Sequence, residues 1–377
     1  MAVVALSAGT KRYLRNFNWL LAASGILAAF VGIVCVRSAG LHTPGAASEF
    51  QKQILYLLLG VPAMLVISLI DYRAWQRWAP GLYAVNFLLL IFILRGGHSA
   101  LGAQRWISLG PLGTFQPSEP AKLVIAIALA AVLCRGSYEN LQDLWKPLLT
   151  VAVPALLILK QPDLGTSLVL LAIVTVELFF ALPKPSDFGI YAVGVLVVAA
   201  AALGTSAVLK PFQRARLFVF LNPKADPQGA GYNLNQSKIA VGNGEWFGRG
   251  LYHGTQTQLN FVPEHSRDFI FTVLAEEWGF AGAAALLGLY AAMLYGGIRS
   301  MVAARDRFGF LLAAGLVGML FFHVMINLGM TIGIMPITGI PLPFLSYGGS
   351  AILTDFAALG ILLNIYSQKD RDVLGNA

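Results

Sequence analysis

The chain has 377 residues, of which 57% are hydrophobic and only 12% are charged. Ordinary soluble domains carry roughly 25% charged residues, so this composition excludes a water-soluble globular protein. The net charge of +8 is compatible with nucleic-acid binding. However, half of the basic residues flank apolar segments on one predicted face, where they would contact anionic lipid headgroups. We therefore expect no nucleic-acid partner.

Ten apolar segments divide the chain, and most approach the roughly 20 residues that a membrane-spanning helix requires. They predict an all-α polytopic membrane protein of about ten transmembrane helices, which we interpret as a single membrane domain over 1–377. Two segments are short and are separated only by the turn KQPDLG. In chain order, the predicted spans lie near 17–36, 54–70, 79–94, 119–134, 147–159, 164–182, 187–209, 268–297, 308–330 and 351–366.

The distribution of Lys and Arg predicts the orientation, because short cytoplasmic connections carry an excess of these residues. With the N-terminus inside, the inner connections hold 13 Lys and Arg, and the short outer connections hold six. This bias predicts that both termini are cytoplasmic and that the long connection 210–267 lies on the outer side.

Polar residues that could carry chemistry gather in five segments on the predicted outer side. Because a polar group in or beside the bilayer is costly, its position indicates a function even in one sequence. His323 and Asn327 share one face of the ninth span, and Asp355 lies about one turn into the tenth. The connections contribute Arg105, Glu119, Lys122, Gln161, Asp163, Glu264, His265, Arg267 and Asp268.

Several of these residues also have a purely structural interpretation. Asp268 stands where a helix is expected to begin, and a carboxylate there can cap free backbone N–H groups. Glu119 and Lys122 are three residues apart and can form a local ion pair. Arg105 beside Trp106 is equally typical of an anchor in the headgroup region.

Metal binding is a further interpretation of the acidic segment before the eighth span. His265 has the carboxylates of Glu264 and Asp268 close to it in sequence. Their spacing is not characteristic of a metal site, so the residues leave the metal requirement unknown.

The segment 331–350 is apolar and yet cannot continue a helix. Pro336, Pro341 and Pro343, together with several glycines, interrupt it. An irregular backbone at membrane depth must be buried in protein or line a cavity, because lipid cannot satisfy its hydrogen bonds. We therefore expect this segment to form a re-entrant wall of an outer cavity.

Six motifs together resemble the SEDS family (shape, elongation, division and sporulation) of multispanning membrane proteins. The segment from Asn327 to Ser350, NLGMTIGIMPITGIPLPFLSYGGS, resembles the family signature nearly in full. The segment GTQTQLNFVPE (254–264) is more similar to the RodA-like branch than to the FtsW-like branch. The other motifs are RWISLG (105–110), QPSEPAK (116–122), QPDLGTS (161–167), GNGEWFGRG (242–250) and PEHSRDFIFTVLAEEWG (263–279).

This resemblance implies a function at the outer face of the cytoplasmic (inner) membrane. It implies a peptidoglycan glycosyltransferase that polymerises lipid II into glycan strands during cell elongation and rod-shape maintenance, and that releases undecaprenyl diphosphate. It also implies a class B penicillin-binding protein, which is a transpeptidase, as a partner. MreC, MreD and MreB of the rod-shape machinery are further implied partners.

The resemblance assigns roles to residues of this chain. Asp268 matches the essential acidic residue of the family and is the predicted catalytic base. No cofactor is built in by the resemblance, although a divalent cation (Mg²⁺ or Mn²⁺) could offset the diphosphate charge. The predicted substrate-binding residues are Arg105, Glu119, Lys122, Gln161, Asp163, Glu264 and Ser346.

One residue departs from the family pattern. Arg267 stands where the family usually has threonine. A neighbouring cation would favour ionised Asp268 and weaken it as a proton acceptor, or it could bind the substrate diphosphate. The sequence does not decide between these roles.

Two other functions are alternatives to a transferase. A transporter of the lipid-linked precursor would carry polar groups at mid-bilayer along an alternating-access path. The deep residues Glu177, Glu276 and Asp355 do not obviously line one path. A non-catalytic scaffold of the cell-wall machinery would require none of the outer carboxylates.

Overall fold

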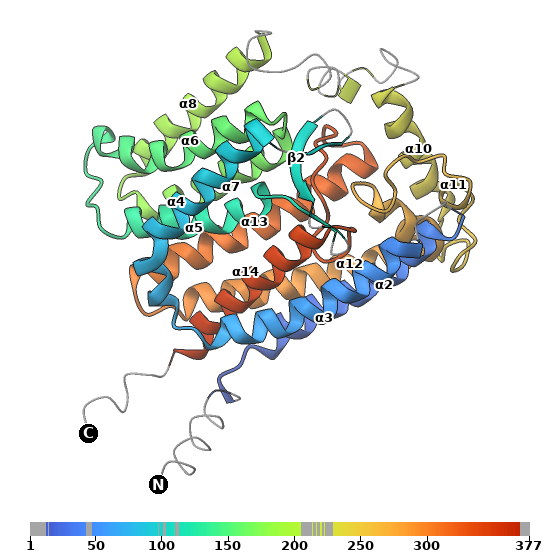
Figure 1. Cartoon of the computed structure of the whole chain (residues 1–377), viewed down its shortest axis with the longest axis horizontal. Helices are drawn as coiled ribbons and strands as arrows, with labels where there is room; N and C mark the ends of the chain where they lie inside the picture. The colour runs from blue at the N-terminus through green and yellow to red at the C-terminus, as the bar shows by residue number, and fades with distance from the viewer. Residues whose placement is uncertain are drawn as a thin grey trace.

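The computed structural model describes residues 13, 15–42, 47–96, 98–100, 103–108, 110, 113–204, 213, 216, 219–220, 222 and 229–369. Its long helices form a bundle, with a small sheet and two shorter helices toward one end (Figure 1). The long helices are α2 (Trp19–Gly40), α3 (Ala47–Leu69), α4 (Tyr72–Gly96), α5 (Ser118–Leu133), α6 (Trp145–Lys160), α7 (Leu164–Ala181), α8 (Pro185–Gly204), α12 (Ile270–Val302), α13 (Arg307–Ile332) and α14 (Gly349–Ser367).

Each of the ten predicted spans falls on one of these helices. In the described part of the chain, eight helices are long and apolar enough to cross a membrane. The other two are α5, which has 16 residues and carries Glu119 and Lys122, and α8, whose apolar stretch is Pro185–Val198. The polytopic all-α fold is therefore confirmed, whereas the count of ten spans stays a prediction. The last residues of the predicted span 187–209, from 205 on, lie outside the described residues.

Several helices begin before the apolar segments that predicted them. Helix α3 begins at Ala47 and α4 at Tyr72, seven residues ahead of the predicted spans in each case. The added turns are polar, and polar side chains are compatible with a helix that extends beyond the hydrocarbon. Hydropathy therefore locates the part of a helix inside the membrane and not the ends of the helix.

Helix α12 is kinked at Gly279. At about 1.5 Å per residue, its 33 residues exceed a bilayer core of about 30 Å. Gly279 has φ +65° and ψ −160°, and a Cβ there would lie 2.3 Å from the backbone nitrogen of Gly248. The freed N–H groups of Phe280 and Ala281 donate to the carbonyls of Glu245 and Trp246, at 2.8 and 3.0 Å. The turn after α10 (Ala230–Asn243) thus replaces the bonds that the kink removes.

The bundle packs closely around α13 and α14. Helix α14 lies on α3, and α13 lies on α7 and α12. Glycine makes the contact of α14 with α3 possible, because a Cβ at Gly60 would lie 2.3 Å from the ring of Phe356. A Cβ at Gly360 would likewise lie 2.7 Å from the carbonyl oxygen of Met64. One hydrophobic cluster extends from Phe17 to Ile365.

Helix α2 begins, and helix α14 ends, at the same end of the bundle. Asn18, which caps α2, donates to the carbonyl of Gly296 near the end of α12, at 2.8 Å. Arg299 of α12 in turn donates to the hydroxyl of Tyr366 near the end of α14. This placement agrees with an even number of spans. Which end faces the cytoplasm stays a prediction.

The opposite end of the bundle holds the irregular connections. Strands β1 (His98–Ala100), β2 (Ala103–Ser108) and β3 (Thr114–Phe115) form an antiparallel sheet in the order β1-β2-β3, which the sequence did not predict. The long connection contains α10 and the short α11 (Thr255–Gln258). Residues 333–348 are irregular and largely buried, as expected for a re-entrant wall.

Candidate active site

Asp268 lies at this end of the bundle, two residues before α12. The N-cap of α12 is Phe269, and no side chain caps the helix, so the capping interpretation of Asp268 is wrong. The carboxylate instead lies against the irregular segment, because a Cβ on Gly339 would stand 3.2 Å from Asp268 Oδ2. Asn327 of α13 donates from Nδ2 to the backbone carbonyl of Asp268 at 2.8 Å.

The surroundings of Asp268 make its carboxylate a stronger base than an ordinary aspartate. Burial raises the pKa of Asp268 to about 6, and the negative charge of Glu264 adds to this effect. Arg216, Arg267 and Arg105 act in the opposite direction. A carboxyl group with this pKa is mostly ionised at neutral pH and can accept a proton.

Arg267 is held on the side of α3. Its guanidinium pairs with Glu49 at 3.5 Å and with Glu264 at 3.7 Å, and it lies over the ring of Tyr347 at 5.7 Å. It lowers the pKa of Asp268, as expected for a neighbouring cation, but burial has the larger effect.

Arg216 is a residue that the sequence reasoning missed. A Cβ on Gly339 would stand 3.6 Å from Arg216 Nη1, so Arg216 and Asp268 both lie within 4 Å of the same point. Burial lowers the pKa of Arg216, whereas the charge of Asp268 raises it. In the sequence, Arg216 is one of several basic residues in a long connection and follows no motif spacing. Its proximity to Gly339, more than one hundred residues away in the chain, and its charge interaction with Asp268 single it out.

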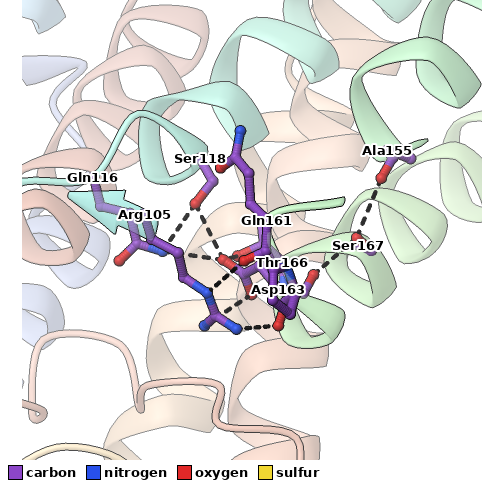
Figure 2. A network of polar contacts seen from close by, with 9 residues as sticks. Arg105, Gln116, Ser118, Ala155, Gln161, Asp163, Thr166 and Ser167 are labelled. Atoms are coloured by element: carbon purple, nitrogen blue, oxygen red, sulfur yellow. Dashed lines mark hydrogen bonds and ion pairs between the residues drawn. The ribbon is translucent and has the colours of Figure 1, made fainter. Parts of the chain in front are cut away.

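Arg105 is held by the turn between α6 and α7 (Figure 2). Its Nε donates to the carbonyl of Gln161 at 2.9 Å, and its Nη2 donates to the carbonyl of Pro162. Its Nη1 lies 3.9 Å from Asp163 Oδ1. The Gln161 side chain is buried and donates to the carbonyl of Leu90 in α4 at 3.0 Å. Arg105 is thus fixed by three consecutive residues of one connection, while its charge lowers the pKa of Asp268.

Asp163 joins three segments in the same network. It caps α7 by accepting from the backbone nitrogen of Thr166 at 3.1 Å. Its other oxygen accepts from Gln116 Nε2 at 3.0 Å and from Ser118 Oγ at 3.2 Å (Figure 2). The structure therefore brings Arg105, Gln161 and Asp163 together, with Asp163 as a linker between elements.

Glu119 and Lys122 form an ion pair inside the bundle. Lys122 Nζ lies 2.8 Å from Glu119 Oε2 and 3.0 Å from His323 Nε2, while His323 Nδ1 lies 2.7 Å from the carbonyl of Met319. Lys122 is 1% exposed and Glu119 is 5% exposed. These two predicted substrate-binding residues are therefore buried, with Lys122 in contact with His323 of α13.

Ser346 and Glu264 both contact Arg267. Ser346 Oγ donates to the carbonyl of Arg267 at 2.7 Å and accepts from the backbone nitrogen of Leu342 at 2.8 Å. Ser346 as a whole is 2% exposed. The Glu264 side chain is 41% exposed, so of these two predicted residues Glu264 is the more accessible.

His265 connects the acidic segment to α2. Its Nδ1 lies 2.8 Å from the carbonyl of Val262, and its Nε2 lies 2.9 Å from the carbonyl of Ala39 at the end of α2. Both ring nitrogens thus lie within hydrogen-bond distance of backbone carbonyls, an arrangement that does not favour a metal site on His265. Over the residues that the structure describes, no three His, Cys, Asp or Glu side chains gather to hold a metal ion.

Together, these features define a class of protein. It is a polytopic helical membrane protein with a carboxylate of raised pKa beside three arginines at one end of its bundle, an arrangement suited to group transfer from an anionic substrate. The chain belongs to the family of cell cycle proteins represented by FtsW, RodA and SpoVE, whose family model matches residues 18–371. The resemblance to the SEDS family is thereby confirmed.

Relatives match nearly the whole chain. The peptidoglycan glycosyltransferase MrdB of Escherichia coli (strain K12) is 39% identical over 323 residues, which cover 85% of this chain and 86% of MrdB. The peptidoglycan glycosyltransferase RodA of Treponema pallidum (strain Nichols) is 34% identical and covers 95% of this chain and 99% of its own.

Solved structures share the fold. One comes from a study of the structural coordination of polymerization and crosslinking by a peptidoglycan synthase complex. It has a TM-score of 0.80 and 32% identity, and the match covers 94% of this chain and 99% of that one. The crystal structure of the rod shape determining protein RodA from Thermus thermophilus has a TM-score of 0.70 and 30% identity, with 94% and 98% covered.

Proposed function

We propose that this chain, a peptidoglycan glycosyltransferase, polymerises lipid II at the outer face of the cytoplasmic (inner) membrane during cell elongation and releases undecaprenyl diphosphate. The observation that carries the proposal is the position of the Asp268 carboxylate, packed against Gly339 with Arg216 at the same point. The names of the relatives support the activity, and the RodA-like loop 254–264 supports the role in elongation.

Asp268 serves as the general base in this proposal. The 4-hydroxyl of the acceptor sugar attacks the anomeric carbon of the donor, and its proton passes to the Asp268 carboxylate. The bond between that carbon and the diphosphate breaks, and the diphosphate leaves with the bonding electrons. One displacement converts an α-linked donor into a β-linked product, so the reaction inverts and needs no covalent sugar intermediate.

Arg216 and Arg105 stabilise the departing diphosphate in this proposal. The positive charges of both arginines lower the pKa of Asp268, so both side chains lie near the carboxylate that accepts the proton. Guanidinium groups bind phosphate oxygens through paired N–H groups. Of the acidic side chains, Glu264 acts most strongly on Asp268. Because the described residues gather no group of three metal ligands, a Mg²⁺ or Mn²⁺ ion would be held chiefly by substrate phosphates, and the arginines supply the fixed positive charge.

The proposed partner is a class B penicillin-binding protein with transpeptidase activity. The similar solved structure comes from a complex that coordinates polymerization and crosslinking, and glycan strands need crosslinking as they emerge. MreC, MreD and MreB complete the proposed elongation assembly.

Reconstitution tests the proposal. The purified chain is placed in liposomes with lipid II, with and without a transpeptidase partner, and glycan polymer and free undecaprenyl diphosphate are measured. We expect both products from the wild-type chain, none from Asp268→Ala, and wild-type yield from Glu245→Gln, which changes an exposed carboxylate paired with Arg249. Lipid II movement across the bilayer without polymer would favour the transporter. Neither product nor movement in any variant would favour the scaffold.

A further inference from the structure

Three consecutive backbone carbonyls of the acidic segment are each held by a donor from another element. The backbone nitrogen of Tyr347 donates to Ser266 at 2.9 Å. Ser346 Oγ donates to Arg267 at 2.7 Å, and Asn327 Nδ2 donates to Asp268 at 2.8 Å. The residues from 266 to 268 are thus attached to α13 and to the irregular segment, and not through the capping of α12.

Asn327 also fixes the surface on which the carboxylate rests. Its Nδ2 donates a second hydrogen bond to the carbonyl of Ile340 at 2.7 Å, the residue next to Gly339, and Gly339 faces Asp268 Oδ2. One fully buried amide therefore sets the position of both the aspartate backbone and the neighbouring glycine. Asn327 lies in the 26-residue helix α13, which is a rigid support for this contact.

We propose that Asn327 and Ser346 are positioning residues, which hold the Asp268 carboxylate at the reacting hydroxyl through the backbone carbonyls of Asp268 and Arg267. This inference rests on the proposed role of Asp268 as the base. An error of about 1 Å in the placement of a catalytic group can cost on the order of 100-fold in rate. Precise placement requires supporting hydrogen bonds around the group that reacts.

The test compares Asn327→Ala and Ser346→Ala with a matched control in full-length chains in liposomes. Tyr290→Phe is the control, because it removes one buried hydrogen bond to the same irregular segment, from the Tyr290 hydroxyl to the carbonyl of Pro343 at 2.7 Å, without touching residues 266–268. The readouts are kcat, KM for lipid II, and the midpoint of the acid limb of the pH profile.

We expect kcat to fall at least tenfold in Ser346→Ala and Asn327→Ala, with KM changed less than threefold. The acid limb should also move below about pH 6, since a carboxylate released from its partly buried place becomes better solvated and has a lower pKa. Tyr290→Phe should keep the wild-type kcat and acid limb. A loss of packing alone would lower the folded fraction and leave the acid limb where it is.

The inference is overturned if the folded Ser346→Ala chain matches Tyr290→Phe in kcat and acid limb while Asp268→Ala is inactive. Ser346→Ala alone decides the question if Asn327→Ala does not fold, because it removes a single oxygen. Failure of the proposed function has a different signature, which is an active Asp268→Ala chain or a wild-type chain that makes no polymer.

Discussion

Replacing Asp268 by asparagine should abolish activity and stabilise the protein at neutral pH. Burial raises the pKa of Asp268 from an ordinary 3.8 to about 6, so the ionised form is less favourable in the folded state than in the unfolded state. Each pKa unit corresponds to about 1.4 kcal/mol, so ionisation costs up to about 3 kcal/mol of folding free energy above pH 6. Asparagine has a similar shape and never ionises.

The pH dependence separates this effect from a general gain in packing. Because the folded-state pKa lies above the unfolded-state value, the wild-type penalty is absent below about pH 4, grows as the pH rises to 6 and is complete above it. We expect the melting temperature of Asp268→Asn to exceed that of the wild type at pH 7.5 and to converge with it near pH 4, as measured in detergent. An equal difference at both pH values, or a less stable variant at pH 7.5, would contradict the reasoning.

Three further changes test the electrostatics and the geometry of the site. Glu264→Gln should lower the midpoint of the acid limb of lipid II polymerisation from about pH 6, since the lost negative charge had raised the pKa of Asp268; an upward move would refute this cause. Lys122→Ala should lower the free energy of unfolding by about 3–5 kcal/mol, because it leaves the buried carboxylate of Glu119 unpaired. Arg249→Ala, which breaks an exposed pair, should lower it by under about 1 kcal/mol. Similar losses of the two variants in chemical denaturation would contradict the burial argument. Gly339 has φ +73°, and the new Cβ of Gly339→Ala would lie against the Asp268 carboxylate, so this variant should reduce kcat more than tenfold. Gly110→Ala is the control for backbone strain, because Gly110 has φ +63° and open space around its Cβ position. Equal activity of the two variants would show that the contact with Asp268 is irrelevant.

The long helices were predictable because burial in lipid is a local property of the sequence. A run of about 20 apolar residues is costly in water whatever lies next to it, so the segments that form α2 and α13 could be predicted from the sequence alone. Pro and Gly from 333 to 348 likewise excluded a helix there. The helix ends were less predictable, because a polar turn costs little at the membrane surface, and the kink of α12 depends on a turn at Glu245 and Trp246.

The site divides in the same way. Asp268 was visible through its motif, and the ion pair of Glu119 with Lys122 was visible through its spacing. The motif around Asp268 did not predict that its carboxylate lies against Gly339 or that Arg216 reaches the same point. The spacing of Glu119 and Lys122 did not predict that Lys122 also contacts His323. These contacts join residues far apart in the chain, and neither periodicity nor hydropathy encodes them.

By itself, then, the sequence determined which stretches enter the membrane and which residues are too polar to be there without a reason, because the cost of transfer into lipid belongs to each residue. Only the tertiary structure decided which of those residues meet. The pKa of Asp268 and the neighbours of Arg105 follow from burial and from charges on other elements, and these are set when the helices pack together.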